Sequence, residues 1–350
     1  SAGFASGFVP PAAVLPGSPA RATPGSVEST FANGLSSLAN ARALSLNAST
    51  DGSRPPGMLS GVQFWVGGTA SFGTRSLGDD QGPYAFSTDG LSLGADRRID
   101  DRLALGLGMG FARDRSDLGG DGTKNKSRGS SFAAYGSYHP SPRTYVDALA
   151  GFGALKFDSE RYVEAFDESF SANRKGDQFF ASVAGGYEYR VRNFLVSPYG
   201  RLDVTVDRLK SATEGGTSPA ALTYEEQKLR TTSAAAGLRL ESTHETDYGR
   251  VAPRARFEYR HDFEGGRTAN VSYADLFGGL TYSVSPAGTS KNALLVGIGS
   301  DFLLSSGWKL GVDYQGERSS GPGTVQSVRF LVSKDLDGKG LPAWSGWTMP

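Results

Sequence analysis

One pentapeptide of this chain has the spacing of a serine nucleophile. The segment Gly90–Gly94 reads Gly-Leu-Ser-Leu-Gly and fits the G-x-S-x-G pattern. That chemistry needs the serine on a sharp strand-to-helix turn beside a histidine. Here Ser92 lies inside an alternating segment, and no helical pattern follows it. We therefore interpret the pentapeptide as part of a β-strand and not as a hydrolase site.

Other segments that resemble ligand-binding motifs also lack residues that such a site would need. Gly106–Gly110 has the glycines of a phosphate-binding loop but continues a period-two pattern, whereas a dinucleotide site needs a helix next. Asp335–Gly338 begins like a calcium loop, but no glutamate closes it. The chain has three histidines (His139, His244, His261) and no cysteine. We expect no enzyme, no cofactor and no metal site.

The period-two pattern is the strongest signal in the chain. Between Leu103 and Phe111, large apolar residues occupy the odd positions and Gly or Ala the even ones. Such a strand has one apolar face and one nearly bare face, which suits the wall of a transmembrane β-barrel. No apolar run reaches the length of a transmembrane helix. The formal net charge of +0 gives no support for a nucleic-acid partner.

Alternating segments of about ten residues recur along the chain, as expected for membrane-spanning strands. They are Val62–Phe72, Gly90–Ile99, Leu103–Arg113, Ser131–Tyr138, Thr144–Phe157, Phe179–Val191, Phe194–Val206, Leu229–Glu241, Arg250–Phe263, Ala293–Leu303, Trp308–Gln315 and Val325–Val332. The predicted fold is an all-β membrane protein, a 12-stranded antiparallel transmembrane β-barrel with an N-terminal α-helix inside the pore. An even strand number returns both ends of the barrel to one side.

The two faces of these strands differ in charge. In Arg250–Phe263 the even positions carry four arginines, each of which would cost about 2–4 kcal/mol at the midplane of a bilayer. That face must line the water-filled interior. The predicted pore-lining residues are Asp96, Asp147, Glu188, Arg201, Asp203, Arg239, Glu241, Arg254, Arg256, Glu258, Arg260, Asp301, Asp313 and Arg329. Either a wet lumen simply accepts mixed charges, or some of them clamp a pore helix through Glu28 and Arg42.

The N-terminal region divides into two parts. Residues 1–25 are rich in Ala, Pro, Gly and Ser and read as a linker. Residues 26–50 follow, with a helix of about 30 Å from about Ser26 to Leu46. Its apolar stripe and basic residue are Phe31, Leu35, Leu38 and Arg42. A chain that starts at Ser1 without a signal peptide is expected to be a mature fragment or the tail of a longer precursor.

The connections between the strands alternate in length. Tight turns are predicted at Asp100-Asp101, Ser141–Arg143 and Arg192-Asn193. Long polar loops are predicted at Thr74–Asp89, Ser116–Gly129, Asp158–Gln178, Arg208–Lys228 and Glu264–Asn292. Short turns on one side and long loops on the other are typical of outer-membrane barrels, with the turns in the periplasm.

From about Ser26 to Val332 the chain resembles the C-terminal β-domain, or translocator, of type V autotransporters. The resemblance rests on the order and spacing of short motifs. They are Phe64–Gly68, Gly90–Arg98, Leu105–Gly110, Ala134–Gly136, Tyr145–Ala148, Ser197–Leu202, Val251–Arg256 and Leu295–Gly299. It implies a barrel in the Gram-negative outer membrane, at residues 62–333, that anchors and exports an N-terminal passenger ending in residues 1–25.

The same resemblance implies partners. They are the barrel-assembly machinery, outer-membrane lipid with lipopolysaccharide, and the chain's own passenger, with the barrel as a monomer. The alternative is an outer-membrane channel or adhesin barrel that acts through its extracellular loops. An enzyme embedded in the membrane would need Ser, His and Asp at one rim, which the pattern does not supply.

Two features depart from the family pattern. Family members usually end at an aromatic residue that the assembly machinery reads, whereas here residues 334–350 follow as a periplasmic tail with Trp344 and Trp347. The tail therefore leaves the assembly signal internal or contacts a periplasmic partner. Self-cleaving members carry an Asn-Asn pair in the pore helix, and this chain has separate Asn33 and Asn40. Finally, we expect the glycines from Gly106 to Gly110 to leave the inner wall bare beside that helix.

Overall fold

The computed structural model describes most of the chain after residue 61. The described residues are 62–78, 81–117, 123–163, 167–215, 220–263, 269–273, 282–284, 291–320 and 323–335. The predicted linker, the predicted pore helix with Phe31, Leu35, Leu38 and Arg42, and residues 336–350 lie outside them.

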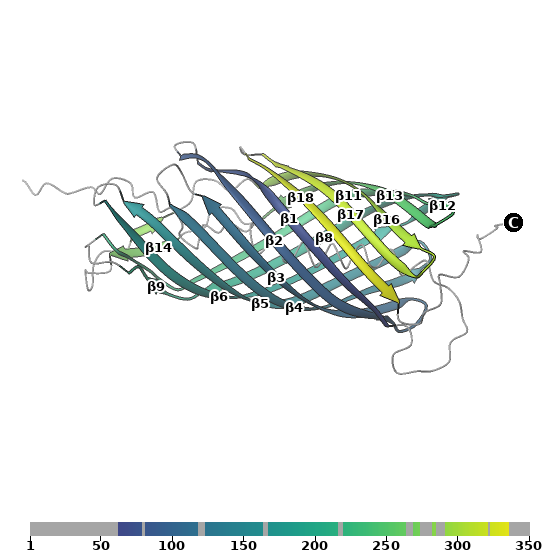
Figure 1. Cartoon of the computed structure of the whole chain (residues 1–350), viewed down its shortest axis with the longest axis horizontal. Coiled ribbons are helices and arrows are strands. Elements are labelled where there is room, and N and C mark those ends of the chain that lie inside the picture. The colour runs from purple at the N-terminus through teal and green to yellow at the C-terminus, as the bar shows by residue number, and fades with distance from the viewer. Residues whose placement is uncertain are drawn as a thin grey trace, which may run out of the picture.

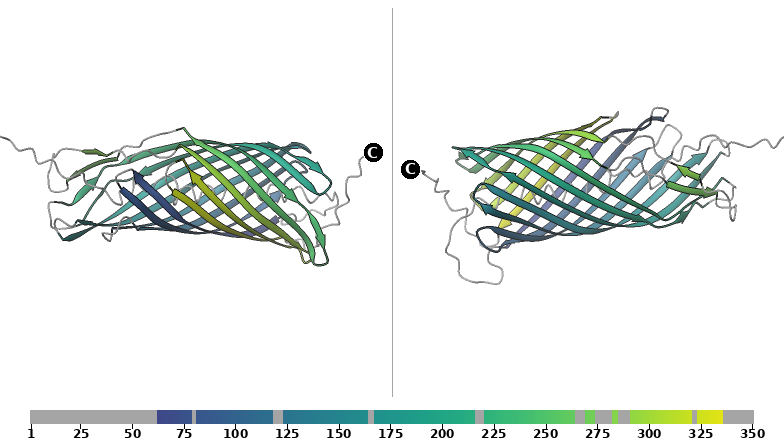
Figure 2. Two further views of the ribbon diagram at one scale, coloured as in Figure 1. Left: turned by 90° about the horizontal axis from the view of Figure 1, so that it is seen from above. Right: turned by 180° about the vertical axis from the view of Figure 1, so that it is seen from behind.

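Twelve long strands close into one antiparallel barrel. They are β1 (Val62–Gly78), β2 (Gln81–Arg98), β3 (Leu103–Asp117), β4 (Lys124–Ser141), β5 (Thr144–Val163), β6 (Glu168–Tyr187), β8 (Phe194–Leu209), β11 (Gln227–Ser242), β13 (Gly249–Asp262), β16 (Asn292–Leu304), β17 (Trp308–Ser319) and β18 (Gly323–Asp335). Each pairs with its neighbours in chain order, and β18 pairs with β1, for example Val66 with Val332, so that the sheet closes. The strands are steeply tilted around the barrel (Figures 1 and 2). The predicted 12-stranded barrel is confirmed.

Short strands lie at both ends of the barrel. β7 (Tyr189–Val191) and β12 (His244–Thr246) extend two hairpins at the tight-turn end. β9 (Ala212–Thr213), β10 (Leu222–Tyr224), β14 (Ala269–Tyr273) and β15 (Tyr282–Val284) form a separate four-stranded sheet in the order β15-β14-β10-β9. This sheet belongs to the two longest connections and lies at the opposite end of the barrel from β12 (Figure 1). We call that end the loop end.

The strands at the loop end are longer than their sequence pattern predicts. Segments predicted as long loops, such as Ser116–Gly129 and Asp158–Gln178, lie largely in strands, and β6 begins at Glu168 instead of Phe179. The cause is chemical. Beyond the apolar belt the outward positions become charged, as at Arg113 and Arg115 in β3, so alternation continues without an apolar face to reveal it.

An apolar belt covers the outer surface between these charged extensions and the tight turns. In β3 the side chains of Leu105, Leu107, Met109 and Phe111 are 41–53 % exposed and alternate with buried positions. Exposed large apolar side chains also lie on the other long strands except β11, which is the surface a lipid environment requires. Within the described residues, no helix has the length and hydropathy needed to cross a membrane.

Aromatic side chains occupy the space above glycines of the inner wall. Tyr135 in β4 accepts a hydrogen bond of 2.6 Å from the indole Nε1 of Trp65 in β1, and both are buried. A Cβ atom at Gly106 would collide with the ring of Tyr135. The expectation of a bare wall is therefore wrong at Gly106, because that glycine makes room for the aromatic ring of the next strand.

Candidate functional site

The inner wall of the barrel concentrates ionisable side chains on β8, β11, β13, β16, β17 and β18. All the charged residues predicted to line the pore have inward positions that alternate with exposed or half-exposed ones. Those that are buried are Asp96, Asp147, Glu188, Arg201, Arg239, Glu258 and Asp301. Those that are half-buried are Asp203, Glu241, Arg254, Arg256, Arg260, Asp313 and Arg329.

Three arginines of β13 reach across β16 to partners on β17. Arg254 donates to the two carboxylate oxygens of Asp313 at 2.8 and 2.5 Å. Arg256 donates to Gln315 at 2.7 Å, and Arg260 lies 2.7 Å from a carboxylate oxygen of Glu317. Because β16 lies between β13 and β17, each pair spans two strand spacings. We call these three pairs, each of which crosses β16, the rungs.

Glycines in β16 make room for two of the three rungs. Gly299 faces Arg254 on one side and Asp313 on the other, and Gly297 faces Arg256 and Gln315 in the same way. A Cβ atom at Gly299 would meet the carboxylate of Asp313 and the main-chain carbonyl of Val312. A larger residue would thus push the two ends of the Arg254 rung apart.

We expect Gly299→Val to destabilise the folded barrel by about 1–3 kcal/mol, since side-chain and main-chain atoms must shift to accept the new methyl groups. The loss can be measured as a lower midpoint of heat-induced unfolding, seen by the change in electrophoretic mobility of the folded barrel. Gly316→Val is the matched control, because nothing lies within 4 Å of a Cβ atom at Gly316. Equal midpoints for the two variants would contradict the role assigned to Gly299.

A buried ion pair anchors the neighbouring part of the wall. Two guanidinium nitrogens of Arg201 in β8 lie 3.2 and 2.9 Å from the carboxylate of Glu258 in β13, across β11. Glu258 also accepts a hydrogen bond of 2.6 Å from the Tyr199 hydroxyl. The Tyr199 ring covers Gly237 of β11 as Tyr135 covers Gly106. Arg201 further binds Asp203 at 2.8 Å.

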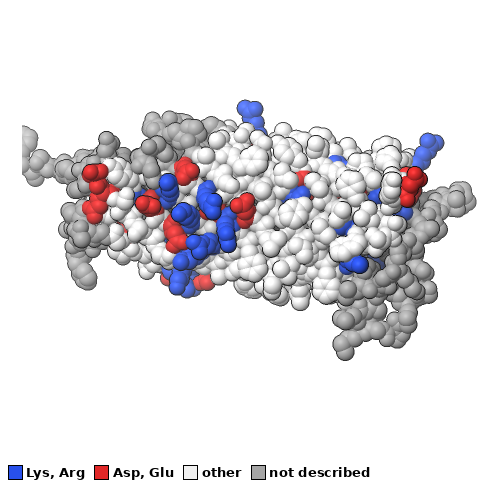
Figure 3. Space-filling view, viewed as in Figure 1, with Lys and Arg blue, Asp and Glu red and all other residues white. Residues whose placement is uncertain are grey.

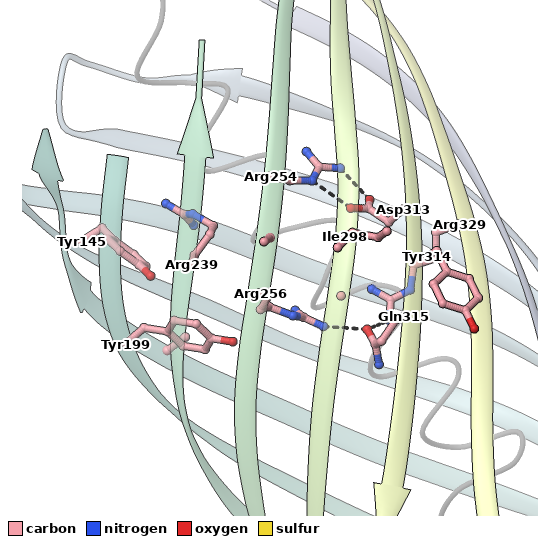
Figure 4. Close-up of a pocket in the computed structure, with 13 residues that line it drawn as sticks. Tyr145, Tyr199, Arg239, Arg254, Arg256, Ile298, Asp313, Tyr314, Gln315 and Arg329 are labelled. Carbon is pink, nitrogen blue, oxygen red and sulfur yellow. Dashed lines mark hydrogen bonds and ion pairs between the residues drawn. The ribbon is translucent and has the colours of Figure 1, made fainter. Parts of the chain in front are cut away.

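Between these two groups lies a pocket rich in cations (Figure 4). Its polar lining comes from Tyr145, Tyr199, Arg239, Arg254, Arg256, Asp313, Gln315 and Arg329. Arg239 pairs with Glu188 at 3.1 Å. Arg256 and Arg329 both donate to the same neutral acceptor, Oε1 of Gln315, at 2.7 Å. Neither arginine has a carboxylate within 4.0 Å among the described residues, so the pocket favours an added acidic or carbonyl group.

Sequence reasoning missed several members of this site. Lys309, which lies 2.9 Å from Asp301, and Gln315 were visible on the polar face of Trp308–Gln315. Glu317 lies beyond the predicted end of that strand. Tyr145 and Tyr199 also line the pocket and were not among the predicted pore-lining residues. Their signal is a facing glycine, which the sequence alone does not pair with them.

A second buried group holds the extra sheet at the loop end. Arg161 of β5 donates to both carboxylate oxygens of Glu214, at 3.0 and 2.6 Å, and to the carbonyl of Ala220 at 2.8 Å. The Tyr224 hydroxyl donates to Glu214 at 2.7 Å. Burial, and then the adjacent Glu214 carboxylate, raise the pKa of Tyr224, so this phenol stays protonated and remains a donor. These contacts tie the β9–β10 connection to the barrel wall.

The motifs with enzyme-like spacing fall in regular strands. Gly90–Gly94 lies inside β2, where the Ser92 hydroxyl approaches the carbonyl of Gly67 at 3.4 Å. Gly106–Gly110 lies inside β3, and β18 ends at Asp335. Across the residues that the structure describes, no cluster of three or more His, Cys, Asp or Glu side chains could hold a metal ion.

Comparison with protein families and curated sequences gives a consistent set of matches. Residues 64–315 match the model of the autotransporter beta-domain. An extracellular serine protease of Serratia marcescens is 24% identical over 263 residues, which cover 73% of this chain and 24% of that protein. Outer membrane protein A of Rickettsia rickettsii is 24% identical over 191 residues, or 51% of this chain and 8% of that protein. The chain therefore spans about a quarter, or less, of these relatives.

Solved structures of the same architecture superpose on this barrel. The translocator domain of the autotransporter NalP from Neisseria meningitidis has a TM-score of 0.65 and 17% identity, covering 87% of this chain and 97% of that one. The beta domain of the Bordetella autotransporter BrkA has a TM-score of 0.59 and 16% identity, covering 79% and 100%. At these identities the similarity concerns the fold.

Proposed function

The chain belongs to the autotransporter β-domain family, and we propose that its cationic pocket holds the segment that joins the barrel to its passenger. As a member of that family, the chain is a translocator in the outer membrane of Gram-negative bacteria. It anchors an N-terminal passenger and exports it to the cell surface. In this proposal the pocket is the place in the barrel where the segment between passenger and barrel binds.

The observation that supports the proposal is the shared neutral partner of Arg256 and Arg329. Arg256 and Arg329, both half-buried, donate to one amide oxygen and have no carboxylate within 4.0 Å among the described residues. A carboxylate brought close to both would gain charge-assisted hydrogen bonds in a site of low dielectric constant. Glu28, in the first turn of the predicted pore helix, supplies that carboxylate.

A second contact, between an acidic residue of the inner wall and a basic residue of the predicted helix, holds the other end of the helix. We call the two contacts the pore clamp. One carboxylate oxygen of Asp147 is buried and has no hydrogen-bond partner in the part of the chain described here. Asp147 lies near the tight-turn end of β5, the end from which the chain enters β1. Arg42, near the end of the predicted helix, is its proposed partner. Residues 26–50 then occupy the lumen, and residues 1–25 are the last part of the passenger.

The remaining partners follow from the same role. The barrel itself makes and breaks no covalent bond, and it acts as a monomer. The barrel-assembly machinery inserts it, and lipopolysaccharide surrounds its outer half. Of the predicted tail at 334–350, Lys334 and Asp335 belong to β18, and residues 336–350 stay in the periplasm as a tail.

Export can be tested with an epitope placed directly before Ser1 and a signal peptide before the epitope. In intact cells the epitope is expected to be removed by added protease, since it lies outside, while the same fusion without residues 62–335 stays protected. If the epitope stays protected while a tag in the β9–β10 connection is cleaved, the barrel is inserted without exporting. That outcome would favour the alternative of a channel or adhesin barrel.

A further inference from the structure

The outer surface carries a row of four cations on adjacent strands near the loop end. In the antiparallel register Arg113 of β3 lies opposite Arg128 of β4, Arg128 opposite Lys156 of β5, and Lys156 opposite Lys175 of β6. All four side chains are exposed and point away from the barrel interior. We call this set the cationic row. Figure 3 shows a dense group of Lys and Arg, with some Asp and Glu among them, on an otherwise largely uncharged outer wall.

The cationic row is poorly neutralised by the protein. Like charges directly opposite each other on neighbouring strands destabilise a sheet. Lys156 has one weak ion pair, 3.8 Å from Asp158. Asp89 stands opposite Arg113 in the register, but no ion pair joins them within 4.0 Å. Arg113, Arg128 and Lys175 form no ion pair with any described residue. External anions are therefore needed to compensate this row.

The next register position toward the loop end adds further cations. Arg115 lies opposite Lys126, which in turn lies opposite Asp158. Only one acid thus faces two more bases, and all three side chains project outward or are half-buried on the outer wall. The positive surface is therefore two register positions deep.

The depth of the cationic row follows from an aromatic row beside it. Phe132, Phe152 and Phe179 lie opposite one another on β4, β5 and β6, and each is exposed. Arg128, Lys156 and Lys175 each lie four residues further toward the loop end than the phenylalanine of the same strand, and Arg113 lies four residues beyond Met109, the β3 residue opposite Phe132. Four residues rise about 14 Å along a strand, or about 10 Å along the axis of a barrel with tilted strands.

That separation matches the step from the apolar layer to the headgroups. Aromatic girdles mark the edge of the hydrocarbon layer, and the headgroup layer lies several ångströms beyond it. The loop end faces outside in an outer-membrane barrel whose tight turns lie in the periplasm. The cationic row therefore meets the headgroups of the outer leaflet, where lipopolysaccharide carries its lipid A phosphates.

We propose that the cationic row of Arg113, Arg128, Lys156 and Lys175 is a binding site for the lipid A phosphates of lipopolysaccharide. The arginine forks can bind phosphate oxygens bidentately, and Lys156 and Lys175 add point charges on the β5 and β6 side of Arg128. The exposed phenylalanines below the row contact the acyl chains of the same molecule. The site deepens the proposed contact with lipopolysaccharide and does not depend on the pore clamp.

The experiment uses the full chain folded in detergent and titrated with bisphosphorylated lipid A, with binding followed by native mass spectrometry. Replacing all four row members by Gln should lower the apparent affinity about tenfold or more, since several charge-assisted hydrogen bonds are lost. The matched control replaces Arg97, Arg102, Arg143 and Arg192 by Gln, four exposed cations at the tight-turn end. This control has the same change in net charge and is expected to bind lipid A like the wild type.

Three results would overturn the proposal. They are equal loss in the control variant, equal binding of lipid A from which both phosphates have been removed, and unchanged binding by the row variant. Heat-dependent mobility reports that each variant is folded, and Arg128→Gln with Lys156→Gln replaces the fourfold variant if the latter does not fold. Export of the epitope before Ser1 is measured in parallel. Failure of the wild-type chain to export the epitope, with its lipid binding intact, would count against the proposed translocator function and not against this site.

Discussion

A chain without residues 26–46 is expected to conduct ions freely across a planar bilayer, whereas the full chain conducts poorly. Barrels of eight strands are filled by their own side chains, and barrels of 16–18 strands hold an aqueous channel. A 12-stranded barrel lies between these sizes, with room for a helix of about 10 Å diameter. We expect the deletion to raise the mean conductance by about tenfold or more, because the lumen loses its filling while its polar wall remains hydrated.

Selectivity gives this experiment a second readout. Arg256 and Arg329 share a neutral partner, so the opened pore should prefer anions. Replacing both by Gln in the deleted chain should reduce that preference without closing the pore. Deletion of residues 1–25 is the control of similar length and should leave conductance low. If the full chain already conducts like the deleted one, the lumen is not occluded and the channel alternative gains support.

The barrel could be predicted because its physical signal is repetitive. Alternation of apolar and small or polar residues, as in Leu103–Phe111, appears on every strand that faces lipid. Charge then identifies the inner face, since residues such as Arg254 and Arg256 cannot face hydrocarbon at low cost. The predicted tight turns are also confirmed, and Arg192 in one of them has a left-handed φ of 54°. Strand number and the side of each residue thus follow from local pattern.

The partners of the site could not be predicted in the same way. Arg254 and Asp313 meet only because Gly299 stands between them in the register of three strands, and register is a property of the closed sheet. The ends of the strands could not be predicted either. Beyond the apolar belt the outward residues, such as Arg113, are charged, so that neither face of the strand is apolar. The helix at 26–50, the tail and the clamp through Glu28 and Arg42 stay predictions.

The second large effect is expected on stability, from the buried pair of Arg201 and Glu258. The side chain of Glu258 is 0% exposed and that of Arg201 is 5% exposed. Removing one partner of a buried ion pair leaves the other charge without a partner and away from water. The free energy of unfolding then falls by about 3–5 kcal/mol. In Glu258→Gln the charge of Arg201 keeps only Asp203, whose side chain is 22% exposed, and the Tyr199 hydroxyl loses its anionic acceptor.

The free energy of unfolding can be measured by urea titration of the barrel in lipid vesicles, with tryptophan fluorescence as the signal. Glu245→Gln is the matched control, because Glu245 pairs with Arg250 at 2.8 Å but is 69% exposed, and exposed pairs contribute about 0–1 kcal/mol. The double variant Arg201→Leu with Glu258→Leu should recover much of the loss, since no charge is then stranded. Equal losses for Glu258→Gln and Glu245→Gln would show that water reaches the pair. The inner wall at β8, β11 and β13 would then be hydrated, and the pocket beside it would bind a carboxylate only weakly.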